Sequence, residues 1–480
     1  MFSQFTSRSY PKCVQFFSTV VACFGGIAVG MHYGWTSPIT PILKKRINLS
    51  DYQIATIETL YMIGGLLSLP LTIYICDRFG RKIAILISAL FNLTSWIMIG
   101  LSKTLTMIYI ARCLCGIAGN IGSVAGTMYI AEISSKSIRG LLTGCSFVAG
   151  LIGIIIIYSI APFVNLTTSS SVGAGFILIQ LMTLIFLPES PYYLLLKKDK
   201  EKSRKSLMFF RNTQNIELEL NEISEAVERL EKEKGRLIDL FKSEGNRKAL
   251  VIMTILNASQ HMAAITVMLM NLHTILKDAE GIIPPESAAI TFSVVMLLSA
   301  IVTILIIDKI GRKILMIYSS TFTCISLLIL ASYFAYKEHD GDITNVKWIP
   351  VVAVMLFAIA FKGGMGMVPI VMSGELFPTS VKTLGMTIVD ALYVIFGAVS
   401  VYIYQGLVNI VGVYCPLYLF AVCSFGTLLF SIFFIPETRG KTLEEIQMIL
   451  KGVKNEVCGD VCQNGGDKKE VIRIKSFENL

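Results

Sequence analysis

The sequence predicts an all-α membrane protein with twelve transmembrane helices in two six-helix pseudo-repeats. The chain has 480 residues, of which 54% are hydrophobic and only 16% charged, whereas soluble domains carry roughly 25% charged residues. Its apolar residues form blocks long enough to supply the roughly 20 helical residues that cross a bilayer. A short charged motif also recurs at the same place in each half of the chain, which indicates an internal duplication.

Each long apolar block is expected to form one transmembrane helix. In the first half these blocks lie near residues 13–37, 54–75, 83–101, 105–130, 141–162 and 172–187. In the second half they lie near residues 249–272, 288–307, 313–336, 349–372, 384–408 and 414–435. The charged segments then divide the chain into an N-terminal half over 1–187, a cytosolic helical linker over 188–248, a C-terminal half over 249–435 and a cytosolic tail over 436–480.

The distribution of lysine and arginine predicts the orientation of these helices. The positive clusters fall on alternate loops, on the same side as the linker, with residues 44–46 as the exception. Because positive loops stay on the cytosolic side, we expect a multi-pass protein of the cell membrane with both termini in the cytosol. The net charge of +9 is therefore read as a topology signal, with the lipid bilayer and not a nucleic acid as the partner.

Two Asn-x-Ser/Thr sequons fall on the outer side in this orientation. They begin at Asn48 and Asn165, and we expect both to be available for glycosylation. The sequons at Asn92 and Asn257 lie inside predicted spans, where no modification is expected.

The linker is expected to contain helices. Ser190 followed by Pro191 has the pattern of a capped helix start. Further along, apolar residues recur at spacings of 4, 3, 4 and 3 between charged residues: Ile216, Leu220, Ile223, Val227 and Leu230. This spacing predicts an amphipathic helix with one apolar stripe that packs under the membrane bundle. A solvated charged helix without a partner is the alternative.

The recurring charged motif lies between the second and third predicted span of each half. The first copy reads Asp77-Arg78-x-Gly80-Arg81-Lys82 and the second Asp308-Lys309-x-Gly311-Arg312-Lys313, about half a chain later. Glycine permits a tight turn here, and the charges can bridge to neighbouring helix ends. Two matching loops at equivalent positions indicate a duplicated transporter fold.

With these loops, the further motifs resemble those of the sugar-porter family of the major facilitator superfamily. Most similar are the insect facilitated trehalose transporter-like members. The matching pieces are Arg112, Tyr129-Ile130-Ala131-Glu132, Arg139-Gly140, Pro188-Glu189-Ser190-Pro191, Gly374-Glu375-Leu376-Phe377-Pro378 and residues 436–446. The resemblance implies the major facilitator fold and a small-molecule sugar as substrate.

The same resemblance implies a gate of charged residues at cytosolic helix ends. A network of this kind would tie the two halves together on the cytosolic side while the site faces outward. Its expected members are Asp77, Arg78, Arg81, Glu132, Arg139, Asp308, Arg312, Glu375 and Lys382.

Transporter sites form near the middle of the membrane, where helices of the two halves are interrupted. The tenth span carries Gly363, Gly364, Gly366 and Pro369, so its helix is expected to open there. In the seventh span Gln260 and His261 stand where the family usually has paired glutamines, and Thr266 follows. Amides suit sugar hydroxyls because they donate and accept hydrogen bonds. Interhelical hydrogen bonding is the alternative role of these residues.

Several positions depart from the family pattern. Polar or tryptophan positions of the family are held here by Phe147, Thr266, Met296, Ile370 and Tyr393. A sugar site that lacks the family's polar side chains at these positions leaves hydroxyl groups of the sugar unpaired, which weakens binding. His32 stands where proton-coupled sugar porters tend to have aspartate, which favours facilitated diffusion over symport.

Two ionisable residues, Lys362 and Asp390, lie inside predicted spans. A charge at the middle of the membrane is costly, so it usually faces a cavity or a partner. We expect the two residues to be electrostatically coupled. Both a structural ion pair and a substrate-contacting pair satisfy this expectation, and Lys362, like Pro369, is a candidate substrate-binding residue.

These observations predict a uniporter that moves trehalose or a hexose such as glucose by alternating access. A sugar sensor or scaffold with weak transport, or a transporter of a non-hexose polyol, is the alternative. An enzyme is not expected, because no zinc-protease, phosphate-loop or serine-hydrolase motif occurs in the chain. No cofactor and no metal ion are expected.

Overall fold

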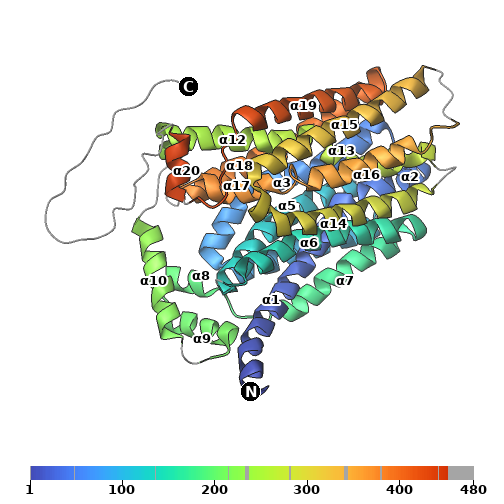
Figure 1. Cartoon of the computed structure of the whole chain (residues 1–480). Helices are drawn as coiled ribbons and strands as arrows, with labels where there is room; N and C mark the ends of the chain where they lie inside the picture. Colours follow the sequence, from blue (N-terminus) through green and yellow to red (C-terminus); the bar gives the residue numbers. More distant parts are fainter. Residues whose placement is uncertain are drawn as a thin grey trace, which may run out of the picture.

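The computed structural model describes residues 2–47, 49–135, 137–213, 216–232, 237–279, 283–339, 344–378, 381–441 and 443–451. Every regular element in these ranges is a helix, and the long helices run side by side in one bundle (Figure 1). Eleven helices in the described ranges are long and apolar enough to cross a membrane. The predicted all-α membrane class is therefore confirmed.

The helices of the first half follow the predicted blocks. They are α1 (Phe2–Gly34), α2 (Thr36–Ile47), α3 (Asp51–Phe79), α4 (Arg81–Gly100), α5 (Leu105–Ile133), α6 (Arg139–Ile160), the 3-10 turn η1 (Ala161–Phe163) and α7 (Leu166–Leu184). The block predicted as one helix over 13–37 is thus divided at Trp35, after which α2 forms a separate short helix.

The linker helices are α8 (Pro191–Leu196), α9 (Lys200–Arg211), α10 (Glu217–Lys232) and α11 (Leu237–Lys242). Ser190 caps α8, as predicted, because its hydroxyl accepts a hydrogen bond from the Tyr193 amide. The apolar stripe of α10 packs against α8 and α9 through Ile216, Leu220, Ile223 and Val227. The amphipathic helix therefore forms as predicted, but its stripe packs on the neighbouring linker helices and not directly under the membrane spans. The side chain of Leu230 lies outside the described residues.

The helices of the second half are α12 (Glu244–Met262), α13 (Ile265–Ile275), η2 (Leu276–Ala279), α14 (Pro285–Ile310), α15 (Arg312–Glu338), α16 (Ile349–Lys362), α17 (Val368–Leu376), α18 (Lys382–Ile410), α19 (Tyr414–Phe433) and α20 (Leu443–Leu450). The tenth predicted span is interrupted between α16 and α17, at the glycines that predicted an opening. The seventh span is also interrupted, at Ala263 and Ala264, and the sequence did not predict this break. Ala264 has φ +68°, a left-handed conformation that cannot continue a right-handed helix.

The two charged loops have the same backbone conformation at their glycine. Gly80 between α3 and α4 has φ +101°, and Gly311 between α14 and α15 has φ +105°. Residues with a Cβ rarely adopt this region, so glycine is required at both turns. Each glycine lets a helix start at the next residue, which is Arg81 or Arg312.

Helices of the first half approach each other closely through glycine. A methyl group at Gly116 of α5 would overlap the backbone oxygen of Tyr61 in α3, and one at Gly64 of α3 would overlap the backbone oxygen of Cys113. Close backbone approach gains dispersion contacts inside a bilayer, where no hydrophobic effect drives helices together. Gly126 of the same α5 has no heavy atom within 4 Å of such a methyl group.

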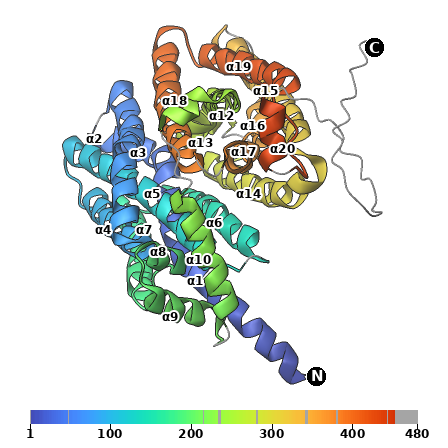
Figure 2. The same cartoon turned by 90° about the vertical axis from the view of Figure 1, so that its left-hand side faces the viewer.

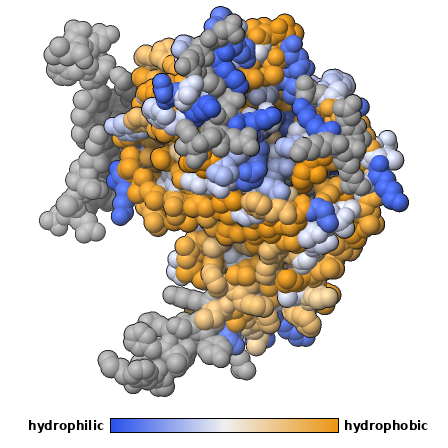
Figure 3. Space-filling model, turned by 90° about the vertical axis from the view of Figure 1, so that its right-hand side faces the viewer, coloured by the Kyte–Doolittle hydropathy of each residue, from blue (hydrophilic) through white to orange (hydrophobic). Residues whose placement is uncertain are grey.

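The bundle has two different ends. Helices α8 to α11 and α20 lie at one end, which we call the linker side, and α2 lies at the opposite end, which we call the α2 side (Figures 1 and 2). The view onto the α2 side shows hydrophilic residues across its upper part and hydrophobic residues over much of the rest (Figure 3). Large apolar side chains are also exposed along the long helices, such as Leu67, Leu90 and Leu305, which is typical of a protein whose flank faces a bilayer.

The halves contact each other on the α2 side. Ser37 of α2 pairs with His273 of α13 (Oγ to Nδ1, 2.8 Å), and the Tyr158 hydroxyl of α6 donates to the Leu269 carbonyl of α13. These hydrogen bonds join the halves on the α2 side, and α3 with α18 and α6 with α14 also pack across the boundary between the halves. On the linker side, the following ion pairs each lie within the linker or within one half: Arg81–Glu132, Arg211–Glu219 and Arg312–Glu375.

We expect Gly116→Ala to destabilise the protein, because the added methyl group forces α3 and α5 apart. Overpacking of a well-packed interface costs about 1–3 kcal/mol. Thermal unfolding of the purified protein in detergent should therefore begin at a lower temperature. Gly126→Ala in the same helix is the matched control and should leave the unfolding temperature unchanged or slightly raised. Equal unfolding temperatures for the two variants would contradict the packing argument.

Candidate functional site

Three of the predicted site residues surround the break between α12 and α13. The His261 Nδ1 atom lies 2.7 Å from the Thr266 hydroxyl, which lies 3.2 Å from the hydroxyl of Tyr33 in α1. The break thus places a short hydrogen-bonded chain between the two halves. His261 and Thr266 are fully buried, so this chain occupies the interior of the bundle.

The other ring nitrogen of His261 has no partner among the described residues, although it is buried. The ring packs against Tyr393 of α18, with centroids 4.2 Å apart. A buried polar atom without a partner costs about 1–3 kcal/mol. A polar group of a bound molecule, placed beside this nitrogen, would remove that cost.

Gln260 directly precedes His261 on α12 and is also buried. Its amide nitrogen reaches the Asn257 side-chain oxygen only at 3.5 Å, a long contact for a hydrogen bond. Asn257 is held more firmly, since its amide donates to the Val389 carbonyl of α18 at 2.9 Å. The Gln260 amide is therefore the more available of the two for a ligand.

The break between α16 and α17 carries Lys362 and Pro369. Lys362 is the last residue of α16 and is half-buried, with Nζ 5.9 Å from the Phe361 ring centroid. Pro369 is buried in the first turn of α17, where a missing N–H is tolerated. Both residues lie at an interruption, as expected.

The expected coupling of Lys362 with Asp390 does not appear as an ion pair between these described residues. Asp390 is exposed on α18. The physical reason lies in the packing, because α16 packs mainly on α14 and α15 whereas α18 packs mainly on α3 and α12. The structure therefore leaves Lys362 beside the break without Asp390 as its partner.

A polar cluster of the first half was largely missed by the sequence analysis. The Arg112 guanidinium is fully buried and donates to the carbonyls of His32 (2.8 Å) and Ile57 (3.3 Å). Glu58 is 1% exposed, and its Oε1 atom has no partner among the described residues. A single glutamate inside the apolar block 54–75 was the signal that would have identified it.

His32 belongs to the same region. Its Nε2 atom lies 3.0 Å from the Asn92 side-chain oxygen, and its ring stacks on Trp96 with centroids 3.8 Å apart. These contacts are those of a hydrogen-bonded packing residue.

On the linker side, four predicted gate residues form two Arg–Glu pairs, one in each half. In the first half Arg81 pairs with Glu132 at 3.0 Å, and Glu132 also accepts a hydrogen bond from the Ser190 hydroxyl. In the second half Arg312 pairs with Glu375 at 2.7 Å, and Glu375 accepts from the Thr438 hydroxyl at 2.6 Å. Asp308 adds a second, exposed contact to Arg312 at 2.9 Å.

In each half a second glutamate accepts hydrogen bonds from the two backbone amides that follow the loop glycine. Glu189 accepts hydrogen bonds from the backbone amides of Arg81 and Lys82, both at 3.1 Å. Glu437 does the same for Arg312 (3.0 Å) and Lys313 (3.1 Å). Free amides at a helix N-terminus favour a carboxylate.

Burial is the largest influence on Glu189 and raises the pKa of this carboxyl above its ordinary value, while the amide hydrogen bonds act in the opposite direction. Glu189 and Glu437 belong to the two Pro-Glu motifs that carry the family resemblance.

The remaining gate candidates lie outside these pairs. The Arg78 guanidinium donates to the Tyr74 hydroxyl at 2.5 Å, and Asp77 is exposed. Arg139 donates to the Ser134 carbonyl at 3.4 Å. The Lys382 Nζ atom donates to the Gly374 carbonyl at 2.6 Å. The structure brings none of these four described residues into an ion pair between the halves.

The structure describes only one of the two predicted glycosylation residues. Asn48 lies outside the described residues. Asn165 caps α7, because its side-chain oxygen accepts a hydrogen bond from the Thr168 amide at 2.8 Å. The cap accounts for the start of this helix.

Known proteins resemble this chain over most of its length. The family described as "Sugar (and other) transporter" matches residues 18–450. The facilitated trehalose transporter Tret1 of Bombyx mori is 26% identical over 441 residues, covering 91% of this chain and 86% of the relative. Tret1 of Apis mellifera ligustica is 28% identical over 457 residues, covering 92% and 88%.

Solved structures show the same fold. The inward open conformation of the xylose transporter XylE from E. coli superposes with a TM-score of 0.75 at 22% identity, covering 90% of this chain and 99% of that one. The proton:xylose symporter XylE bound to 6-bromo-6-deoxy-D-glucose gives 0.73 at 22% identity, covering 92% and 100%. The chain therefore has the major facilitator fold and belongs to the sugar transporter family, whose members are transporters and not enzymes.

Proposed function

We propose that the protein is a uniporter that moves trehalose or a hexose such as glucose through the membrane by alternating access. The twin Arg–Glu clusters on the linker side carry this proposal. Each half has the same rigid assembly at its linker end, built from Arg81 and Glu132 in one half and Arg312 and Glu375 in the other. Two rigid halves that meet on the α2 side can rock about the space between them.

The substrate in this proposal binds at the two breaks in the second half. Gln260, the free nitrogen of His261 and the Thr266 hydroxyl supply donors and acceptors for sugar hydroxyls. Lys362 and Pro369 line the second break. This site lies in the interior of the bundle, where a hydrogen bond to a desolvated hydroxyl group contributes to specificity.

The gate residues act at the stage of the cycle in which the substrate site faces outward and the linker side is closed. The described ion pairs of the two Arg–Glu clusters lie within each half and do not join the halves. This pattern is the one expected for the stage of the cycle in which the bundle is open on the linker side. When the halves close on that side, we expect Arg139 and Lys382 to exchange their backbone partners for carboxylates of the other half. Asp77, Arg78, Arg81, Glu132, Asp308, Arg312 and Glu375 complete the proposed gate.

The proposed orientation follows from the charge distribution. The linker side faces the cytosol, and both termini lie there, since positive residues gather on it. Asn165 and Asn48 then face the outside of the cell membrane, where glycosylation is available to them.

A sugar sensor with weak transport, or a carrier of a non-hexose polyol, is the second candidate. The departures from the family pattern favour it. Tyr393, at a position where the family usually has asparagine, presents its ring to His261, and Met296 is buried and apolar at another polar position of the family. Fewer side-chain amides leave fewer partners for a hexose.

Uptake by vesicles that contain only this protein tests the function. We expect labelled trehalose or glucose to equilibrate across the membrane faster than in empty vesicles. An imposed pH gradient should not drive accumulation above equilibrium, because His32 is a packed residue where proton-coupled members tend to have an acid. Accumulation that collapses with a protonophore would contradict uniport, and polyol uptake alone would favour the second candidate.

The gate is tested by comparing two acids that contact Arg312. Glu375→Gln should slow uptake by roughly tenfold, equivalent to about 1.4 kcal/mol in barrier height, and should leave equilibrium substrate binding unchanged. Asp308→Asn, at the second acid of the same cluster, should slow uptake less than Glu375→Gln. The Asp308 side chain is 80% exposed, against 24% for Glu375, so solvent already screens its charge. Equal loss of binding and uptake in Glu375→Gln would place this residue in the substrate site instead.

The substrate site is tested at Gln260. Gln260→Ala should weaken binding by roughly 1–3 kcal/mol if its amide pairs with a desolvated hydroxyl. His261→Gln should be tolerated, because an amide can replace the ring nitrogen near Thr266. Gln405→Ala in α18, whose side chain contacts Asn409, is the control. Substrate affinity of the purified variants, measured at matched folding, decides the point, and unchanged affinity in Gln260→Ala would remove this residue from the site.

A further inference from the structure

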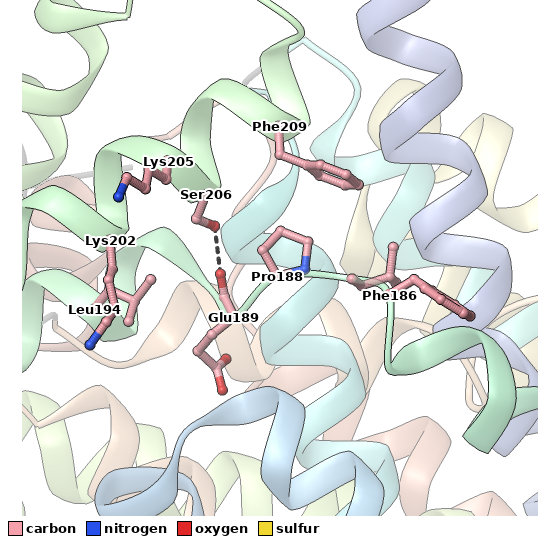
Figure 4. Close-up of a pocket in the computed structure, with 9 residues that line it drawn as sticks. Phe186, Pro188, Glu189, Leu194, Lys202, Lys205, Ser206 and Phe209 are labelled. Carbon is pink, nitrogen blue, oxygen red and sulfur yellow. Dashed lines mark hydrogen bonds between the residues drawn. The ribbon is translucent and has the colours of Figure 1, made fainter.

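An open groove lies on the linker side between the end of α7 and helix α9, away from the two broken helices. Its volume is about 390 Å³, and its lining includes Phe186, Glu189, Lys202, Lys205 and Phe209 (Figure 4). The transport mechanism proposed above makes no use of these lysines or phenylalanines.

One wall of the groove is apolar and continuous with a membrane span. Phe186 is 81% exposed, and Met182 and Ile185 are also exposed where α7 ends. Phe209 of α9 adds a second exposed aromatic side chain. Because α7 is a candidate membrane span that ends at Leu184, this wall continues the apolar surface of the bundle at the edge of the bilayer.

The opposite rim is basic. Residues 197–211 contain seven lysines and arginines and only two acids. Lys202 and Lys205 are 72% and 74% exposed, and they pair with Asp199 at 2.8 Å and with Glu201 at 3.5 Å. Exposed pairs of this kind are weak, and an ammonium group has three donors, so both lysines can bind a further anion. The hydrogen bond that the Lys202 ammonium donates to Asp199 raises the pKa of this lysine, which keeps it charged.

The half-buried acid of the groove, Glu189, does not compete for these lysines. The Glu189 carboxylate is held by the backbone amides of Arg81, Lys82 and Ser190. Its side chain points away from α9 in Figure 4, while its backbone oxygen accepts a hydrogen bond from the Ser206 hydroxyl at 2.5 Å. The charge that remains open to the groove is therefore positive.

We propose that this groove binds the phosphate headgroup of an anionic phospholipid from the leaflet on the linker side. Lys202 and Lys205 bind the phosphate, and the acyl chains lie along Phe186 and the exposed end of α7. Basic residues beside an apolar surface are the combination that recognises anionic lipids. A soluble phosphate would satisfy the lysines but would leave the aromatic wall in water.

Such a lipid would be connected to the gate of the first half. Helix α9 contacts the loop at Glu189 through Ser206, and Arg211 at its end donates to the Ile133 carbonyl of α5 at 2.7 Å. Ile133 follows Glu132, the partner of Arg81. The bound headgroup thereby fixes α9 against the same loop that positions the Arg81–Glu132 pair.

Lipid titration of the full-length protein tests the site without reference to the transported substrate. Phosphatidylglycerol and phosphatidylcholine are added to the detergent-purified protein, and bound lipid is counted by native mass spectrometry. We expect phosphatidylglycerol to bind more tightly, and Lys202→Gln/Lys205→Gln to weaken it by roughly tenfold, since each lysine near an anionic headgroup contributes to binding. Lys242→Gln/Lys248→Gln, at two exposed lysines of the same side, is the matched control and should change little.

Two further arms identify the source of the phosphate. Inorganic phosphate should not displace the bound lipid, and Phe186→Asn should weaken phosphatidylglycerol binding while Lys202 and Lys205 remain. Equal affinity for both lipids, or an unchanged affinity in Lys202→Gln/Lys205→Gln with normal thermal unfolding, would overturn the proposal. Displacement by inorganic phosphate would overturn it in favour of a soluble-anion site.

Discussion

The absence of hydrogen-bonding partners in hydrocarbon governs this structure. Every backbone group within a bilayer must be satisfied by the protein itself, so the chain crosses as helices and can open only where protein surrounds it. At the break after α16, the Gly366 amide donates to the Phe361 carbonyl and the Met365 amide to the Ser319 hydroxyl, both at 2.8 Å. The breaks are therefore enclosed, and polar side chains gather beside them.

A second constraint is the burial of charge at helix ends, and both halves meet it with the same arrangement of residues. In each half a glycine with positive φ ends one helix and starts the next, and a glutamate caps the new helix through its backbone amides. The arginine that follows the glycine, Arg81 or Arg312, then reaches a glutamate on another helix of the same half. Burying such a pair is acceptable because further hydrogen bonds satisfy both partners. Each half therefore carries its own hydrogen-bonded charge cluster at its linker-side end.

The interior of the first half holds its charges differently. Arg112 is fully buried, but carbonyl oxygens and aromatic faces surround it, with the Tyr61 ring centroid 4.9 Å from the guanidinium carbon. Glu58 lies within electrostatic range of Arg112. These groups keep a polar interior in a half whose Phe147 position lacks the amide common in the family. The interiors of the two halves therefore differ. The second half contains the interrupted seventh and tenth spans, whereas the first half contains a closed polar cluster around Arg112.

The sequence by itself determined the fold class, most span positions, the duplicated charged loops and the capped helix at Ser190, because these depend on local composition, periodicity and turn chemistry. It also located the break at Gly363 to Pro369, since glycine and proline act locally. Only the tertiary structure decided that α12 breaks at Ala264, a residue with no local signal, and that Lys362 and Asp390 stay apart on helices that pack against different neighbours. Packing between distant segments likewise selected Glu132 and Glu375 as the partners of the loop arginines, while Arg139 and Lys382 contact backbone oxygens.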